Sequence, residues 1–142
     1  MIPEIIPQQL GLQSVALDAM RGAEDARYEP RPSGKDEWIA RARAVISSVP
    51  TDWLDQLSPA FTATGEAARR LAGSGSGKGI VVTTGQQPGL FGGPLYTLSK
   101  ALTALALANE IERLTGIPTA PVFWAATDDT DFREASKTVI SV

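Results

Sequence analysis

A glycine-rich segment, residues 85–93, is the first part of this chain whose composition suggests chemistry. Its glycines are spaced as Gly85, Gly89, Gly92 and Gly93. Backbone N–H groups of such a loop, placed before a helix, favour anions such as phosphate or carboxylate. The spacing is not that of the dinucleotide fingerprint, so a nicotinamide cofactor is not indicated. We therefore expect an anion-binding loop, the alternative being glycines that only permit a tight turn and close helix packing.

Polar side chains flank this loop and complete the predicted binding set: Thr84, Gln86, Gln87, Tyr96 and Lys100. The adjacent amides can both donate and accept hydrogen bonds. Tyr96 and Lys100 are four residues apart and should share a helix face. Lys100 is the only charged residue between Gly79 and Asn109, so we expect it to meet a phosphate or carboxylate. The alternatives are a solvent-exposed amide pair and a lysine that reaches into water.

An acidic run follows the next predicted strand and contains Asp128, Asp129 and Asp131. Such carboxylates can hold magnesium, bind an amine or act as a general base. Three carboxylates so close together repel one another unless a cation, a ligand or N–H donors compensate. Asp129, Asp131 and Lys100 are therefore the predicted catalytic residues, with Asp128 in binding. Simple capping of a helix that starts at Phe132 is the alternative.

The composition excludes several function classes. The chain has 142 residues, 43% hydrophobic and 20% charged, with a net charge of −3. These values are typical of one soluble domain. The sequence contains no histidine and no cysteine, which excludes Ser-His and Cys-His catalysis and the usual zinc ligands from these residues. Without a basic stripe, a signal peptide or a bilayer-length apolar stretch, we expect a cytoplasmic protein that binds neither nucleic acid nor membrane.

Residues 1–78 are predicted to be an N-terminal helical segment. Apolar spacing favours helices at residues 8–20, 35–48 and 53–72, the last interrupted near Pro59. Residues 73–79, rich in glycine and serine, are expected to form a flexible connector. Gly77 and Lys78 do not complete a P-loop, because the spacing is one residue short and the strand follows rather than precedes them.

Residues 79–142 read as a strand-helix-strand unit and a further strand. We expect strands at residues 80–84, 121–126 and 137–142, and a helix from Pro94 to Thr115 that is apolar on nearly all sides and hence covered on both. This predicts an α/β fold with an open parallel sheet of about three strands, preceded by helices. The carboxyl ends of parallel strands share an edge, so the glycine loop and the acidic run should share a cleft. A sheet that stops here suggests the N-terminal part of a longer protein.

Four stretches of the sequence together resemble a known family: residues 82–97 (VTTGQQPGLFGGPLYT), 116–118 (GIP), 121–124 (PVFW) and 129–132 (DTDF). They are similar to the N-terminal Rossmann-like region of the bacillithiol biosynthesis cysteine-adding enzymes. The resemblance implies a Rossmann-like fold and a ligase that joins cysteine to glucosaminyl malate. It also implies a longer, homodimeric protein, and activation of a carboxylate for which ATP with Mg²⁺ is the expected cofactor.

One position departs from the family pattern. The family typically has Glu-Asp-His-Asp-Phe where this chain has Asp-Asp-Thr-Asp-Phe, so Thr130 replaces a histidine that would be a natural proton shuttle. Two other hypotheses therefore remain. The chain could be a non-catalytic small-molecule-binding homologue of the same fold, or a small α/β interaction module.

Overall fold

The computed structural model describes residues 32–128 and 131–137. The chain divides into two units, residues 1–33 and 34–142, and every element described here belongs to the second. The predicted helix at residues 8–20 lies outside the described residues. So does the predicted strand at 137–142 apart from Lys137, which is not in a strand. Asp129 and Thr130 are outside as well.

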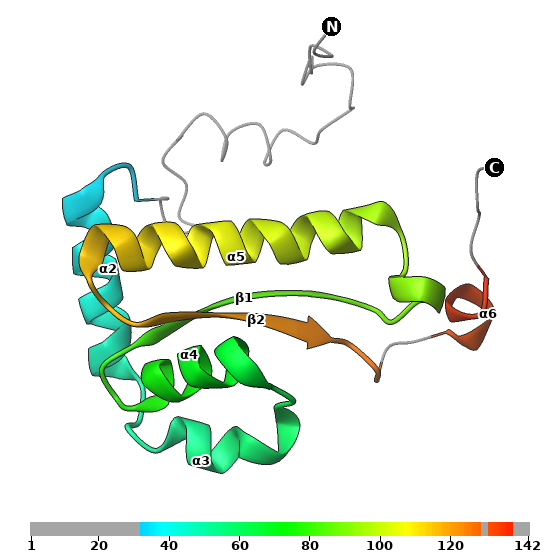
Figure 1. Ribbon diagram of the computed structural model, residues 1–142, viewed down its shortest axis with the longest axis horizontal. Helices are drawn as coiled ribbons and strands as arrows, with labels where there is room; N and C mark the ends of the chain where they lie inside the picture. Colours follow the sequence, from blue (N-terminus) through cyan, green and yellow to red (C-terminus); the bar gives the residue numbers. More distant parts are fainter. Residues whose placement is uncertain (1–31, 129–130, 138–142) are drawn as a thin grey trace, which may run out of the picture. The chain divides into compact units, whose positions relative to one another are not determined.

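The second unit has two parallel strands between helical layers (Figure 1). Strand β1 (Ile80–Gln86) pairs with β2 (Thr119–Ala125), with Gly85 opposite Trp124 and Gln86 opposite Ala125. Helix α5 (Leu95–Thr115) lies on one face of the strands, and α4 (Gly65–Gly75) on the other. The α/β fold with a parallel sheet is confirmed, with two strands among the described residues.

The helices before the strands follow the sequence expectations closely. Helix α2 (Lys35–Ser48) has the predicted bounds, and it packs against α5 and β1. Asp36 and Glu37 lie in its first turn, where the positive end of the helix dipole interacts favourably with their negative charges and stabilises the helix. Helix α3 (Trp53–Leu57) passes into the short 3₁₀ helix η2 (Ser58–Ala60) at the expected proline, and α4 follows separately.

The glycine- and serine-rich connector was predicted wrongly in part, because α4 continues through Gly73, Ser74 and Gly75. Tight packing explains this. Ser74 is fully buried, and a Cβ on Gly75 would lie 2.2 Å from a methyl carbon of Leu54. A Cβ on Gly79 would lie 2.5 Å from the Cα of Ser74. The glycines here allow close approach of backbone rather than flexibility.

Helix α5 begins one residue later than expected, with Pro94 as its N-cap, and it ends at Gly116, whose left-handed φ of 71° suits glycine. Its buried residues are small or branched: Ala104, Ala108 and Ile111. Leu95, Leu98 and Leu102 are more than half exposed. The described residues therefore cover this helix on one side, where its composition predicted two. Within the described residues, no helix is both long and apolar enough to span a membrane.

Helix α6 (Phe132–Ala135) is the next described element after β2, and it forms where the sequence places Phe132 directly behind the acidic run. It lies beyond the carboxyl ends of the strands, at the same end as the loop before α5 (Figure 1). This end of the sheet is the one that positions the candidate site.

Candidate functional site

The candidate site lies where β1 and β2 end side by side. The two ends are joined by a hydrogen bond of 3.1 Å from the Ala126 N–H to the Gln86 carbonyl oxygen. The glycine loop leaves from one of these ends, and Asp128 lies just beyond the other. The shared edge expected from a parallel crossover is therefore present.

Gly85 and Gln86 belong to strand β1 and not to the loop, which corrects the boundary expected from the sequence. A Cβ on Gly85 would lie 2.7 Å from the carbonyl oxygen of Trp124, its partner in the sheet. The absence of a side chain at Gly85 therefore allows β1 and β2 to lie close together at this position. Thr84, opposite Phe123, is half-buried in the same strand, and Gln87 is half-buried just after it.

The remaining glycines close the loop on itself. The N–H of Gly92 donates to the Gly89 oxygen at 3.0 Å, and that of Gly93 donates to the Leu90 oxygen at 3.1 Å. A Cβ on Gly89 would lie 2.7 Å from the Cα of Gly93. These two N–H groups are thus hydrogen-bonded within the loop, so they are not available to bind the anion that the sequence led us to expect. In the first turn of α5 the Thr97 N–H donates to the Pro94 oxygen at 2.8 Å, so an anion would meet the N–H groups of that turn other than that of Thr97.

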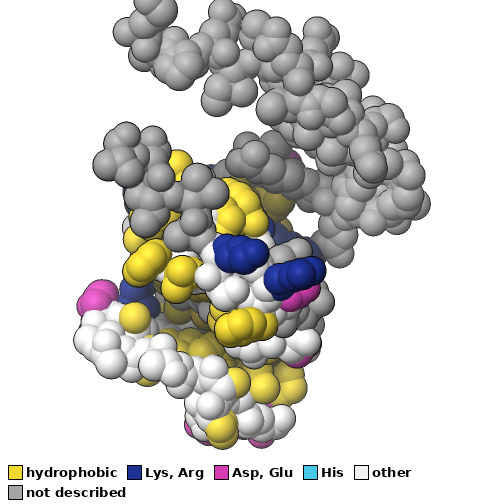
Figure 2. Space-filling model, turned by 90° about the vertical axis from the view of Figure 1, so that its right-hand side faces the viewer, with side chains coloured by type: hydrophobic (Ala, Val, Ile, Leu, Met, Phe, Trp, Pro, Cys, Tyr) yellow, Lys and Arg dark blue, Asp and Glu magenta, His cyan; other side chains and the backbone are white. Residues whose placement is uncertain are grey.

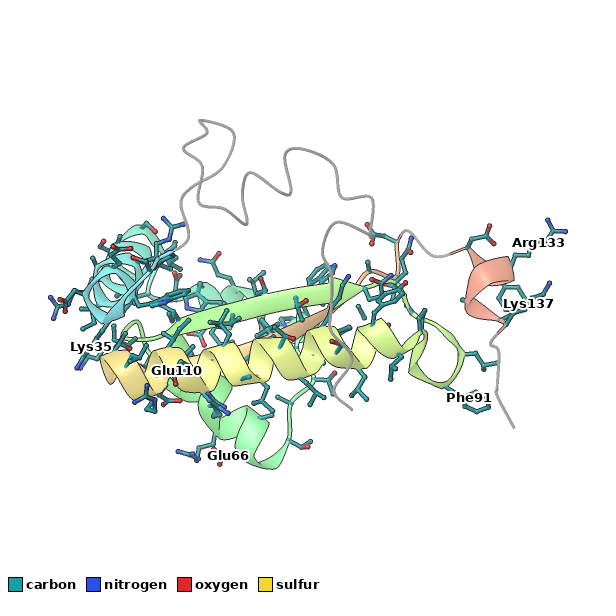
Figure 3. The ribbon with its side chains drawn as sticks, turned by 90° about the horizontal axis from the view of Figure 1, so that it is seen from above. Lys35, Glu66, Phe91, Glu110, Arg133 and Lys137 are labelled. Atoms are coloured by element: carbon teal, nitrogen blue, oxygen red, sulfur yellow. The ribbon has the colours of Figure 1, made fainter. Side chains whose placement is uncertain are left out.

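Backbone strain concentrates at the tip of the loop. Phe91 has a φ of 56°, which is uncommon for an aromatic residue, and Gly92 and Gly93 have φ values of 90° and 79°. The side chain of Phe91 is 82% exposed. It projects beyond the start of α5, at the opposite end of the unit from Glu110 (Figure 3). Strained, exposed residues of this kind are typical of functional loops.

Lys100 reaches the end of β1. Its Nζ donates to the Gln86 Oε1 at 2.9 Å and to the Gly85 carbonyl oxygen at 3.3 Å. It also lies 5.5 Å from the centre of the Tyr96 ring, within cation–π range. Lys100, Tyr96, Gln86 and Gly85 are therefore brought together at this edge.

The acidic run is only partly described. Asp128 and Asp131 are exposed, and Asp131 Oδ1 accepts a hydrogen bond of 2.7 Å from the Arg133 N–H at the start of α6. This is the capping role that the sequence left as an alternative. The described residues contain no group of three acidic or other ligating side chains that could hold a metal ion.

Sequence reasoning missed Thr97. Its Oγ1 is buried and has no hydrogen-bond partner in the described structure, and a Cβ on Gly93 would lie 3.3 Å from it. Thr97 also lines a largely apolar cavity of about 450 Å³ between the loop, the first turns of α5 and Phe123. Nothing in its position at the third residue of an apolar helix distinguished it in the sequence.

Exposed apolar side chains gather at this end of the unit, with Lys and Arg beside them (Figure 2). The most exposed are Phe91, Leu95 and Phe132, all above 80%. A second apolar groove of about 580 Å³ lies between β2 and the segment from α3 to α4, with Phe61 and Trp124 in its walls. The carboxyl edge of the sheet is thus flanked by apolar hollows on both faces.

Comparisons with known proteins identify the family of this domain. The family model described as the N-terminal Rossmann-like domain of the bacillithiol biosynthesis protein BshC matches residues 26–142. A protein of Heliobacterium modesticaldum named "Putative cysteine ligase BshC" is 54% identical over 71 residues, which is 50% of this chain and 12% of that protein. Proteins of the same name from Exiguobacterium sibiricum and Salinibacter ruber are 46% and 54% identical over 65 and 55 residues, 46% and 39% of this chain.

The matched segments span 10–12% of the length of these three relatives. No solved structure matches. The family model, however, covers more than half of the chain and includes both strands, the glycine loop and the acidic run. The chain therefore belongs to the family of the N-terminal Rossmann-like domain of the bacillithiol biosynthesis protein BshC.

Proposed function

We propose that this chain is the substrate-binding part of a cysteine ligase of bacillithiol biosynthesis, which joins cysteine to glucosaminyl malate by forming an amide bond. The observation that carries the proposal is the meeting of the β1 and β2 ends, with the Lys100 ammonium fixed beside them. The names of the relatives support the ligase class. We further propose that the whole protein works in the cytoplasm as a homodimer.

In this proposal the two substrates are held by different parts of the edge. The carboxylate of glucosaminyl malate lies at the loop and the first turn of α5, where the positive charge of Lys100 and the helix dipole favour an anion. Thr84, Gln87 and Tyr96 border that position. The acidic residues Asp128, Asp129 and Asp131 orient the cysteine amine.

The amide bond joins the cysteine carboxyl carbon to the amine of glucosaminyl malate, with loss of the elements of water. The cysteine carboxylate needs activation for this, for which we propose ATP with Mg²⁺. The described residues do not fit these groups. The N–H groups of Gly92 and Gly93 are bonded within the loop, and Asp131 caps α6. We therefore assign no step of nucleotide chemistry to the described residues of this chain.

The proposal is tested with the full-length protein supplied with glucosaminyl malate, cysteine and ATP, with bacillithiol measured by mass spectrometry. We expect product, and a large loss in Lys100→Ala. The matched control is Lys35→Ala, at the far end of the unit, which should leave the rate unchanged (Figure 3). Binding of glucosaminyl malate without any product would sink the ligase function and leave a non-catalytic binding protein.

That second candidate has one observation in its favour, the presence of Thr130 where the family typically has histidine. Product formation by the wild type discriminates between the two, because an active ligase works with threonine at this position and a non-catalytic homologue makes no product. If the wild type is inactive, product gained in Thr130→His would show that loss of the histidine is the cause. An interaction module would bind its partner equally well in Lys100→Ala and Asp131→Ala and would bind neither small molecule.

A further inference from the structure

Lys100 is held by groups of the protein itself. An ammonium group has three N–H donors and no acceptor atom. Two hydrogen bonds join its Nζ to the Gln86 Oε1 at 2.9 Å and to the Gly85 carbonyl oxygen at 3.3 Å, and the Tyr96 ring centre lies 5.5 Å away. Lys100 is therefore directed toward the end of β1 by these contacts.

These contacts also determine the orientation of the Gln86 amide. Because Lys100 can only donate, the atom of Gln86 that faces it is the oxygen, and Nε2 with its two N–H donors lies on the other side of the amide. The Gln86 main chain is held as well, since its carbonyl oxygen accepts the Ala126 N–H at 3.1 Å. Both ends of this residue are thus fixed at the carboxyl edge of the sheet.

We propose that Lys100 is a positioning residue and that the Gln86 side-chain amide is the group that contacts the substrate carboxylate. Two N–H donors beside a fixed positive charge suit an oxygen acceptor that carries negative charge. They do not suit the cysteine amine, because a protonated amine is itself only a donor and is repelled by the ammonium. This inference rests on the proposed function, since it takes the carboxylate to be that of glucosaminyl malate.

The competing explanation is that Lys100 only holds α5 against β1. Removing such a structural contact would lower the stability of the fold, and ligand binding would weaken only as far as the fold is destabilised. Positioning through Gln86 makes a different prediction, because two residues that act as one unit give losses that do not add.

The test is a double-mutant cycle in the full-length protein, with Gln86→Ala, Lys100→Met and the double variant. Binding of glucosaminyl malate is measured by calorimetry, and its KM and kcat by product formation. A hydrogen bond to a charged group corresponds to about a ten- to hundred-fold weaker affinity when it is lost. We expect each single variant to lose about that much, the double variant to lose no more than either, and the change to appear in KM.

Three controls keep the result interpretable. Lys100→Arg retains donors for Gln86 and should recover part of the affinity, Gln86→Glu should lose it because a carboxylate repels the substrate, and Lys35→Met should change nothing. The unfolding midpoint of each variant separates loss of fold from loss of binding.

Losses that add in the double variant, or an affinity unchanged by Gln86→Ala, would overturn the inference, as would a wild-type protein that binds no carboxylate substrate. If the wild type makes product and neither Gln86→Ala nor Lys100→Met changes KM, this inference is overturned and the proposed function stays intact. If the substrate binds and the variants show the expected cycle but no product forms, the proposed ligase function is overturned and this inference stands.

Discussion

The guanidinium of Arg70 on α4 is bonded to the carboxylate of Glu112 on α5, with Nη2 and Oε2 3.1 Å apart. The same nitrogen donates to the Thr119 carbonyl oxygen at 2.5 Å, and Nη1 donates to the Asn109 Oδ1 at 2.7 Å. The Arg70 side chain is only 14% exposed. One residue therefore links both helical layers to the start of β2, and it borders a cavity of about 370 Å³ at the opposite end of the strands from the candidate site.

Arg70→Met should lower the free energy of unfolding by about 1–3 kcal/mol, because three acceptors lose a charged donor at once. Urea unfolding measures the change. The matched control is Arg69→Met, since Arg69 pairs with Glu66 on the exposed surface and such pairs contribute little. An equal response of the two variants would contradict the linking role of Arg70.

Gly85→Ala should destabilise the unit by about 1–3 kcal/mol and disturb the site, since the added Cβ would meet the backbone oxygen of Trp124 and a strand must move. Thermal unfolding gives the stability, and titration with glucosaminyl malate gives the affinity. Gly73→Ala is the control, because a Cβ there would meet only the Pro118 Cβ, at an ordinary contact distance of 3.9 Å. A Gly85→Ala protein as stable as wild type would show that the strands are less closely held.

Thr97→Val should leave the free energy of unfolding unchanged or raise it by about 1 kcal/mol, because it removes a buried hydroxyl that has no partner in the described structure. Thr97→Ser, which keeps the hydroxyl, should gain nothing. Chemical denaturation measures both. A clear loss of stability in the valine variant would mean that the hydroxyl is bonded in solution, for example to water.

Asp131→Asn separates the two roles of Asp131. An asparagine side chain can still cap α6 at the Arg133 N–H but carries no charge. If the carboxylate orients the cysteine amine as proposed, product formation should fall at least about ten-fold, the factor that a 1.4 kcal/mol loss corresponds to. Full activity in Asp131→Asn together with loss in Asp131→Ala would leave capping as its sole role.

The surface pairs on α5 and α4 predict a mild pH dependence. The hydrogen bonds from Arg113 hold the pKa of the Glu110 carboxyl below its ordinary value, and Arg69 does the same for the pKa of Glu66. A depressed carboxyl pKa stabilises the fold above the unfolded pKa, and that contribution is lost as the pH falls through the folded value. Arg113→Gln should raise the pKa of Glu110 in an NMR titration and leave that of Glu66 lowered.

Local patterns in the sequence were sufficient for most of the described helices and for the position of the edge. The apolar spacing of residues 35–48, the break at Pro59 and the end of α5 at Gly116 are each set by short-range rules of helix periodicity, proline geometry and left-handed φ. Parallel pairing follows from the helix between two strands, so that the shared edge at the ends of β1 and β2 could be predicted before any coordinates.

Only the tertiary structure decided which atoms meet at and around that edge. Composition marks residues 73–79 as a connector, yet the helix continues through Ser74, which is buried beside Gly79, and Gly75, which packs against Leu54. The glycines of the loop predicted free backbone N–H groups, but those of Gly92 and Gly93 are hydrogen-bonded within the closed turn. The contacts of Arg70, Thr97 and Lys100 depend on which atoms of distant segments meet. Sequence spacing determines periodicity and chain reversal, whereas hydrogen-bond partners depend on packing between residues tens of positions apart.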